Sequence, residues 1–335
     1  MPSAPRALLA IPLALVAACV LACGAGEGGA PGAFRVALLT PGSVSDGGWN
    51  QSAYEGLQRV REELGAEIRN EETKTPAQFE EGFRDYGARG FALVFGHGFE
   101  YQEAAAKVAP EFPGTVFVTT SGSTVRPNVA PMVFELEQAT YLCGFLAARL
   151  SRTKLLGLVG GRELPSIEST FVAFRAGAEA ADPAVRVRTV FTGDFSDAGN
   201  ARQAALALIE EGADFLMHQA NDAGRGVFQA VSERSTADAP VYAFGTNRDQ
   251  NAMAPGVVLA SAVLDVPAAF VEVARQVKEG RFVAAPIRLG MAQGIVAFVP
   301  SPALASRIPE PVRSELAALE QRIRAGELQV PRGAF

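Results

Sequence analysis

The sequence predicts an α/β fold in which two doubly wound, parallel-sheet lobes are built from one chain. Short apolar segments typical of strands alternate with amphipathic helical segments along almost the whole sequence. About 300 residues follow an apolar N-terminal segment, and a chain of that length usually divides its core in two. No low-complexity linker separates the halves. We therefore expect two intertwined lobes rather than independent units.

The first element is an apolar N-terminal segment. Arg6 precedes an unbroken apolar run over residues 7–22, and Cys23 follows directly. The run is too short to span a bilayer comfortably, but its length suits the hydrophobic part of a secretory signal. The sequence therefore predicts a signal peptide over residues 1–22, so that the folded part works outside the cytoplasm.

The end of this segment resembles a bacterial lipoprotein processing site, where the chain is cut before a Cys that then carries lipid. The tetrapeptide VLAC ending at Cys23 fits, and the tetrapeptide ending at Cys19 fits nearly as well. Cys23 is preferred because residues 23–33 form a short tether rich in Gly, Ala, Glu and Pro. The alternatives are lipidation of Cys19 or a plain signal peptide.

The first half of the body then alternates strands and helices. Residues 34–40 form an apolar strand, and Asp46 caps a helix whose apolar positions repeat at helical spacing until Gly65. The sequence TPAQ at residues 75–78 combines an N-cap, a first-turn Pro and a Gln at the third helical position, so it opens a second helix. Further strands are predicted over residues 66–71, 91–96 and 115–120, with a helix between the last two.

The second half repeats this pattern. Helices are predicted over residues 137–150, 166–181, 197–211, 223–234, 266–278 and 309–324. Strands are predicted over residues 155–160, 186–191, 215–219, 241–245, 257–263, 287–291 and 296–299. The pattern predicts a second parallel-sheet domain like the first.

Charge, cysteine content and hydropathy argue against a nucleic-acid partner, a disulfide in the folded body and a second membrane segment. The formal net charge of −6 and the isoelectric point near 5.2 argue against a nucleic-acid partner. Of the three cysteines only Cys143 belongs to the folded body, so no disulfide forms within it. We expect Cys143 to be a buried small hydrophobic residue. No second apolar run approaches transmembrane length, so a lipid would be the only membrane attachment.

The sequence is poor in catalytic and metal-binding groups. His97 and His218 are far apart and have no Cys partner at a spacing typical of metal ligands. No nucleophile elbow, Walker-type phosphate loop or Ser-x-x-Lys motif occurs. Adjacent Glu pairs point in different directions on a helix and are expected to be solvated. We therefore expect no enzyme activity, no metal and no cofactor.

Turns that follow the predicted strands carry aromatic and amide side chains, over residues 46–51, 160–163, 218–222 and 245–250. Because the carboxyl ends of parallel strands meet at one edge of a sheet, these turns are expected to converge on one ligand site. Trp49 lies beside two glycines and an Asn, which suits a stacking surface better than a core position. The alternative is a structural contact between the lobes.

At these residues the chain resembles the basic membrane protein family of substrate-binding lipoproteins, whose best understood members bind purine nucleosides for an ABC importer. The resemblance covers residues 34–291 and is best at SDGGWNQSAYEGL (45–57), GLVGGRELPS (157–166), 192–213 and 220–230. It implies a type I periplasmic binding protein, with two α/β lobes joined by three crossings that act as a hinge. We place the first lobe at residues 34–134 plus 262–284, and the second at 135–261 plus 285–335.

The resemblance also implies roles for particular residues. Trp49 matches the aromatic residue that stacks on the purine, and Asn50 matches the amide that bonds its edge. Gln219 follows a predicted buried strand and is expected to line the site, as is His218 unless it is a satisfied core histidine. Asp222 is expected to contact the ligand. The alternatives for Asp222 are an ion pair in the hinge region or a charge at the rim of the site. For Arg248 the same three possibilities stay open.

Other positions depart from the family pattern. Thr119 or Thr120 stands where the family has an Asp, so Thr120 is the expected ligand contact. Asn247 replaces the Asp that grips ribose, and Leu264 replaces a Lys. These replacements leave fewer strong hydrogen bonds for a sugar. A purine base or nucleoside remains the first expectation, with a larger neutral heteroaromatic molecule or a more apolar ligand as alternatives.

The expected function is that of a monomeric, lipid-anchored solute-binding protein on the extracytoplasmic face of the cell membrane. It would capture a small heteroaromatic solute between its lobes and deliver it to the permease of an ABC importer. One alternative is a sensory lipoprotein of the same fold that signals to a partner protein. A secreted nucleoside hydrolase is a further alternative, but it needs a nucleophile or metal site that the sequence does not offer.

Overall fold

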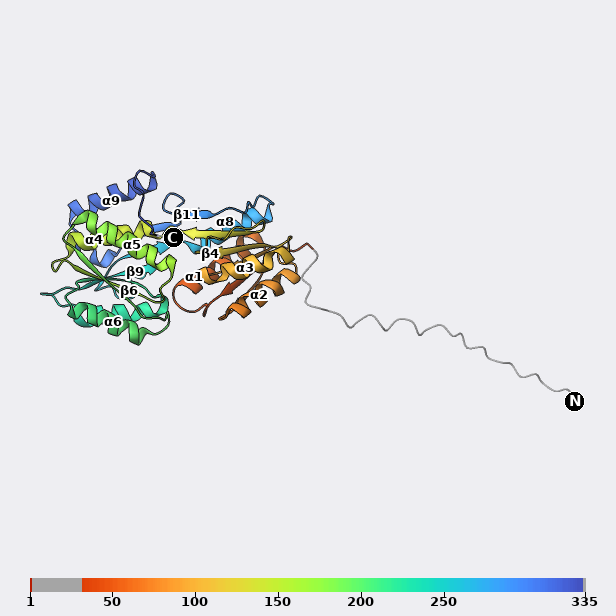
Figure 1. The fold of residues 1–335 in the computed structure, drawn as a ribbon, viewed down its shortest axis with the longest axis horizontal. Helices are drawn as coiled ribbons and strands as arrows, with labels where there is room; N and C mark the ends of the chain where they lie inside the picture. The colour runs from red at the N-terminus through yellow and green to blue at the C-terminus, as the bar shows by residue number, and fades with distance from the viewer. Residues whose placement is uncertain (2–31, 334–335) are drawn as a thin grey trace. The chain divides into compact units, whose positions relative to one another are not determined.

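Two six-stranded sheets organise the part of the chain that the computed structural model describes, which is Met1 and residues 32–333. The first sheet contains, in spatial order, β11 (Ile287–Leu289), β5 (Val129–Phe134), β4 (Val116–Thr120), β3 (Leu93–Gly96), β1 (Arg35–Thr40) and β2 (Glu67–Glu72). The second contains β12 (Val296–Pro300), β10 (Val258–Leu264), β9 (Tyr242–Asn247), β8 (Phe215–Gln219), β6 (Leu155–Gly160) and β7 (Arg186–Phe191). The prediction of two parallel-sheet lobes is confirmed (Figure 1).

All strand pairs are parallel except β10 with β12. The helices of the first lobe are α1 (Trp49–Leu64), α2 (Pro76–Ala88), α3 (Gln102–Val108) and α8 (Val266–Lys278). Those of the second are α4 (Glu137–Leu150), α5 (Pro165–Ala181), α6 (Ala198–Glu210), α7 (Gly224–Arg234) and α9 (Glu310–Arg324). Figure 1 shows α4 and α5 on one side of β6 and β9, and α6 on the other side. Helices on both faces are typical of a doubly wound domain.

The predicted helix ends agree with the local chemistry. Thr75 and Gln78 form the reciprocal capping box at the start of α2, in which each side chain bonds the backbone N–H of the other. The helix α1 ends at Gly65, whose φ of +64° lies in the left-handed region that glycine adopts without strain. Along α1, a Cβ on Gly56 would lie 3.1 Å from Phe270, so the missing side chain lets α8 pack closely.

The chain passes between the sheets after β5, after β10 and after β11. These passages shift the expected lobe limits. Residues 262–264 belong to β10 in the second sheet, whereas they were placed in the first lobe. The strand β11 pairs with β5 in the first sheet, whereas residues 285–335 were placed in the second lobe. In both places the sheet to which a strand belongs is decided by the neighbouring strand that its backbone bonds to.

The strand β5 has no counterpart among the predicted elements. Its sequence contains Pro131, which has no backbone N–H to donate and argues against a strand inside a sheet. In the structure β5 lies between β4 and β11 and is buried along its whole length. Burial of its apolar side chains outweighs the local signal of the proline.

Buried apolar side chains form the cores of both lobes. One cluster lies with α2 and α3 in the first lobe, another with α6 and α7 in the second, and a third contains residues of both lobes. Cys143 is fully buried on α4 in the shared cluster, which confirms its interpretation as a small core residue. Within the described residues, no helix is both long enough and apolar enough to cross a membrane.

The N-terminal predictions concern residues that the structure does not describe. Apart from Met1, the signal peptide predicted over residues 1–22 lies outside the described part, as do Cys23, its alternative Cys19, and the tether except for residues 32 and 33. They therefore stay predictions.

Candidate ligand-binding site

The indole ring of Trp49 stands at the first turn of α1, where it stacks on the imidazole of His97. The ring centroids are 3.9 Å apart and the planes differ by 21°. Phe134, at the end of β5, meets the indole edge-on at 5.9 Å between centroids. Trp49 is half-buried, whereas His97 is fully buried. One face of the indole is therefore held by the protein.

His97 is held as a neutral imidazole. Burial lowers its pKa to about 3, although the bond to the Trp49 carbonyl opposes this shift. Its Nε2 lies 3.0 Å from the carbonyl oxygen of Trp49, and its Nδ1 lies 3.3 Å from Oγ1 of Thr120. A carbonyl only accepts, so the proton sits on Nε2, and Nδ1 accepts from the Thr120 hydroxyl. This arrangement fixes the orientation of the imidazole under Trp49.

Two polar atoms, one in the first turn of α1 and one on β4, are buried without a partner among the described residues. Asn50 is 4% exposed, and its Oδ1 has no hydrogen-bond partner among the described residues. Thr119, on β4 beside Thr120, is also fully buried with Oγ1 unpartnered in the same part of the chain. Most buried polar groups are hydrogen-bonded, so an atom of this kind is available to a water molecule or to a bound ligand.

The second lobe contributes amide groups at the ends of β8 and β9. Asn247 has a φ of +67°, and its Nδ2 donates to Oε1 of Gln219 at 3.4 Å. Both side chains are more than nine-tenths buried. His218 belongs to the core instead, because its Nε2 bonds to Oε1 of Gln250 at 2.9 Å and burial lowers its pKa to about 4. The alternative of a satisfied core histidine therefore fits His218.

Asp222 and Leu264 are engaged within the protein. Asp222 forms an ion pair with Arg225 three residues along the chain. Leu264 is 5% exposed at the end of β10 and packs in the shared hydrophobic cluster. The structure thus brings Trp49 and Thr120 together through His97, while Asp222 is paired inside the second lobe.

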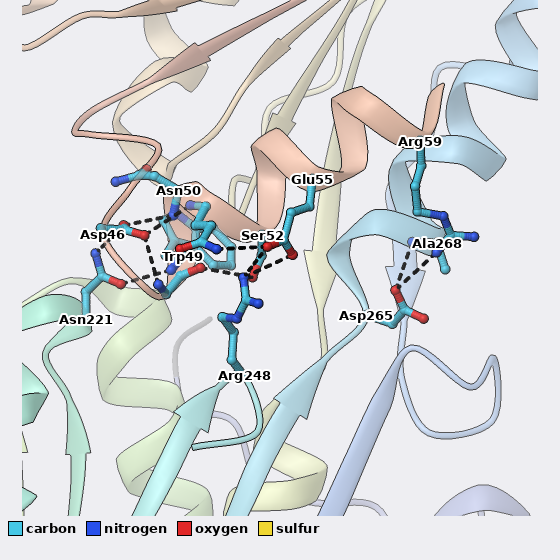
Figure 2. A network of polar contacts seen from close by, with 12 residues as sticks. Asp46, Trp49, Asn50, Ser52, Glu55, Arg59, Asn221, Arg248, Asp265 and Ala268 are labelled. Atoms are coloured by element: carbon cyan, nitrogen blue, oxygen red, sulfur yellow. Dashed lines mark hydrogen bonds and ion pairs between the residues drawn. The ribbon is translucent and has the colours of Figure 1, made fainter. Parts of the chain in front are cut away.

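The two lobes make direct polar contacts beside Trp49 (Figure 2). The backbone N–H of Trp49 donates to Oδ1 of Asn221 at 2.9 Å, and Nδ2 of Asn221 donates to Oδ2 of Asp46 at 2.7 Å. Nη1 of Arg248 lies 3.0 Å from the carboxylate of Glu55. We call the contact of Asp46, Trp49 and Glu55 with Asn221 and Arg248 the interlobe junction. For Arg248 the structure shows an ion pair between the lobes.

Local sequence patterns do not reveal the roles of two residues, His97 and Asn221. The stacking role of His97 was not predicted, because nothing in its local sequence shows that β3 places it against α1. Asn221 lies in a turn that was singled out, but its contact with the first lobe depends on tertiary structure.

This arrangement of aromatic and amide groups between two α/β lobes suits binding rather than catalysis. No group of three or more His, Cys, Asp or Glu side chains positioned to hold a metal occurs in the residues described. A model of PnrA-like ABC transporter substrate-binding proteins, the Bmp family, matches residues 33–332. The chain belongs to this family. Its members are substrate-binding proteins of ABC transporters, not a family of enzymes.

Relatives of this Bmp protein extend over most of its length. Basic membrane protein A of Borreliella afzelii is 26% identical over 93% of this chain and 95% of its own. A purine-binding protein of Brucella abortus is 25% identical, and the match covers 88% of this chain and 82% of that protein. An ABC transporter nucleoside-binding protein of Lactococcus lactis is 27% identical, and the match covers 74% of this chain and 76% of that protein. The expected resemblance to the basic membrane protein family is confirmed.

Solved structures agree with the fold. An ABC transporter solute-binding protein from Conexibacter woesei superimposes with a TM-score of 0.72 at 30% identity, covering 90% of this chain and 99% of its own. The Bmp protein therefore has the type I fold of periplasmic solute-binding proteins, as expected.

Proposed function

We propose that this protein is a lipid-anchored, extracytoplasmic receptor that binds a small neutral heteroaromatic molecule beside the interlobe junction and delivers it to the permease of an ABC importer. A purine base or purine nucleoside is the proposed ligand. The family supports the transport role and a permease partner. The anchor and the location rest on the apolar segment at residues 7–22 and on Cys23.

The observation that carries the proposal is the pair Trp49 and Asn50. Trp49 offers a ring whose other face is already backed by His97, so a stacked ligand meets a surface that is fixed in advance. Asn50 adds a buried acceptor with no partner among the described residues. A flat ring with an N–H group on its edge satisfies both at once.

The charges at the site favour a neutral ligand. The Asp46 carboxylate already accepts three backbone N–H groups and the amide of Asn221. The Glu55 carboxylate is paired with Arg248. The buried polar side chains described above include amides and a hydroxyl, namely Asn50, Thr120, Gln219 and Asn247. Neutral donors and acceptors suit the edge of a nucleobase.

The names of two relatives support the ligand class. The Brucella abortus relative is a purine-binding protein, and the Lactococcus lactis relative is a nucleoside-binding protein. Asn247 stands where the family resemblance implies an Asp that grips ribose. The test should therefore include free bases as well as nucleosides.

The test is thermal unfolding of the chain without residues 1–22, with adenine, guanine, adenosine, guanosine, riboflavin and ribose in turn. A ligand that binds only the folded state stabilises it, by about 2.7 kcal/mol at a concentration of 100 times Kd. We expect stabilisation by at least one purine compound, and a smaller shift in Asn50→Leu, which removes the buried acceptor. No shift with any purine, in folded protein emptied of carried-over ligand, would refute the purine assignment.

A further inference from the structure

The start of α1 is capped by both lobes, and this feature points beyond ligand binding. The first four backbone N–H groups of a helix have no partner within it. In α1 they belong to Gly48, Trp49, Asn50 and Gln51. Asp46 accepts those of Gly48, Asn50 and Gln51 at 2.9 to 3.0 Å, within the first lobe. The fourth, from Trp49, is accepted by Asn221 of the second lobe.

We propose that Asn221 is a positioning residue that latches the two lobes by completing the N-terminal cap of α1 across the junction, and so fixes Trp49 in its stacking position. The inference rests on the proposed function, in which Trp49 stacks on the ligand. The latch bonds are the two that Asn221 makes, from Trp49 N–H and to the Asp46 carboxylate. The second bond has an ionised acceptor, so it is stronger than a bond between neutral groups.

Gly48 shows that the contact is shaped for Asn221. A Cβ on Gly48 would lie 2.3 Å from Oδ1 of Asn221, which is closer than any real contact allows. The nearest obstacle to a Cβ at Gly48 is therefore a side chain of the other lobe. Asn221 has a φ of +50°, which Asn tolerates better than most residues.

A second contact joins the same helix to the same lobe. Nη1 of Arg248 reaches the Glu55 carboxylate at 3.0 Å and Oγ of Ser52 at 3.5 Å. The Arg248 and Glu55 side chains are 30% and 42% exposed, so solvent and salt weaken their attraction. Asn221 therefore gives the junction its geometry, and the ion pair adds a contribution that depends on salt.

Lobe contact and ligand binding are coupled because both involve Trp49. The backbone of Trp49 donates to the latch, and its side chain forms the stacking surface. The latch forms only when the lobes meet, so whatever holds Trp49 in this position favours lobe contact. By linkage, lobe contact then favours ligand binding to the same extent.

Trp49 is the only tryptophan in the chain, so its fluorescence reports on the latch without any ligand. The test compares the ligand-free protein with Asn221→Gly, which keeps the left-handed backbone but removes the amide. Lys154→Gly is the matched control, because Lys154 also has a positive φ, of +59°, but precedes β6 at the other end of the sheet. The probes are Trp49 emission, its quenching by acrylamide, and the radius of gyration from small-angle X-ray scattering.

We expect Asn221→Gly to show red-shifted emission, stronger quenching and a larger radius, because the loss of these bonds lowers the ratio of latched to open protein by about tenfold. Gly48→Ala, in which the new methyl group meets Asn221 only when the lobes touch, should change all three in the same direction. Lys154→Gly should change none of them. Each variant is first checked for cooperative unfolding, so that general misfolding is recognised.

The double variant Asp46→Asn with Asn221→Asp tests the pairing itself, because it exchanges the amide and the carboxylate between the partners. Asn221→Asp alone places two carboxylates together and should open the junction. The double variant should restore part of the parental emission and radius, because the exchanged amide donates to the exchanged carboxylate but no longer accepts the Asn50 N–H. Unchanged emission and radius in both Asn221→Gly and Gly48→Ala would overturn the latch. These readouts use no ligand, so they are independent of whether any purine binds.

Discussion

At the residue scale, the site depends on a histidine that carries no charge. His97 is buried, its Nε2 donates to the Trp49 carbonyl, and its Nδ1 accepts from Thr120. A charged imidazole would donate from both nitrogens, and burial disfavours it. Neutral His97 therefore serves as a platform for Trp49 rather than as an acid or a base.

This protonation state predicts how stability depends on pH. Burial lowers the pKa of His97 to about 3 and that of His218 to about 4, from 6.5 in the unfolded chain. Below pH 6.5 the unfolded chain takes up protons that the folded chain does not. The free energy of unfolding should therefore fall as the pH falls from about 6.5 toward 4, by about 2 to 4 kcal/mol between pH 7 and 5 for both groups.

Urea unfolding at pH 7, 6 and 5 measures this loss. In His97→Gln the loss should be about half as large, since one of the two buried histidines is gone. A stability that stays constant over this range would show that the histidines are not held neutral by burial.

Truncation of the stacking ring gives a second prediction at this scale. Trp49→Ala should weaken the binding of a purine ligand by roughly 1 to 3 kcal/mol, the range for stacking of a base on an aromatic side chain. Calorimetric titration measures the change, and Trp49→Phe should retain most of the affinity because it keeps a ring. Equal affinities in Trp49→Ala and the parent protein would remove Trp49 from the site.

The sequence indicated part of the candidate site. The turn at residues 46–51 indicated Trp49 and Asn50 because an aromatic ring and an amide stand among glycines. The roles of His97 and Asn221 depend on which strands and lobes are adjacent, and a local sequence pattern does not contain that information. Contact with a ligand stays a prediction for Trp49, Asn50, Thr120, Gln219, Asn247 and Asp222.

At the element scale, caps set the helix ends, and this is why most of them could be predicted. The capping box of α2 shows it, since both of its hydrogen bonds lie within four residues of chain. Strand β5 shows the limit, because its place in the sheet is decided by burial and not by Pro131. Similarly, the assignment of β11 to the first sheet comes from pairing with β5, a partner more than a hundred residues away.

The cap of α2 predicts a measurable stability. Thr75→Ala removes the acceptor for the Gln78 N–H and should lower the free energy of unfolding by about 1 kcal/mol. Thr75→Ser keeps the hydroxyl and should cost much less. Denaturant unfolding of the two variants decides the point, and equal losses would mean that the hydroxyl does not act as the cap.

At the scale of the whole molecule, the chain passes three times between two sheets, and polar contacts join the lobes beside the candidate site. The alternation of strands and helices predicted the two-lobe fold. The lobe limits were less predictable, because backbone pairing places the end of β10 in the second sheet and β11 in the first, past the limits placed from the family resemblance.

Attachment to the membrane is a prediction at this scale. If Cys23 is the lipid acceptor, Cys23→Ser should move the protein from the membrane fraction to the soluble fraction of cells that make it. Cys19→Ser should leave the distribution unchanged. Anchoring that persists in Cys23→Ser and is lost in Cys19→Ser would assign the lipid to Cys19.

The most direct measurement of the proposed function is the fluorescence of Trp49 during titration of the ligand-free protein with purine bases and nucleosides. Because this is the only tryptophan, a ring that stacks on it should change its emission saturably, with the same Kd that calorimetry gives. Calorimetric binding without any change in Trp49 emission would place the ligand elsewhere. No binding of any purine would contradict the proposal that this protein is a purine receptor.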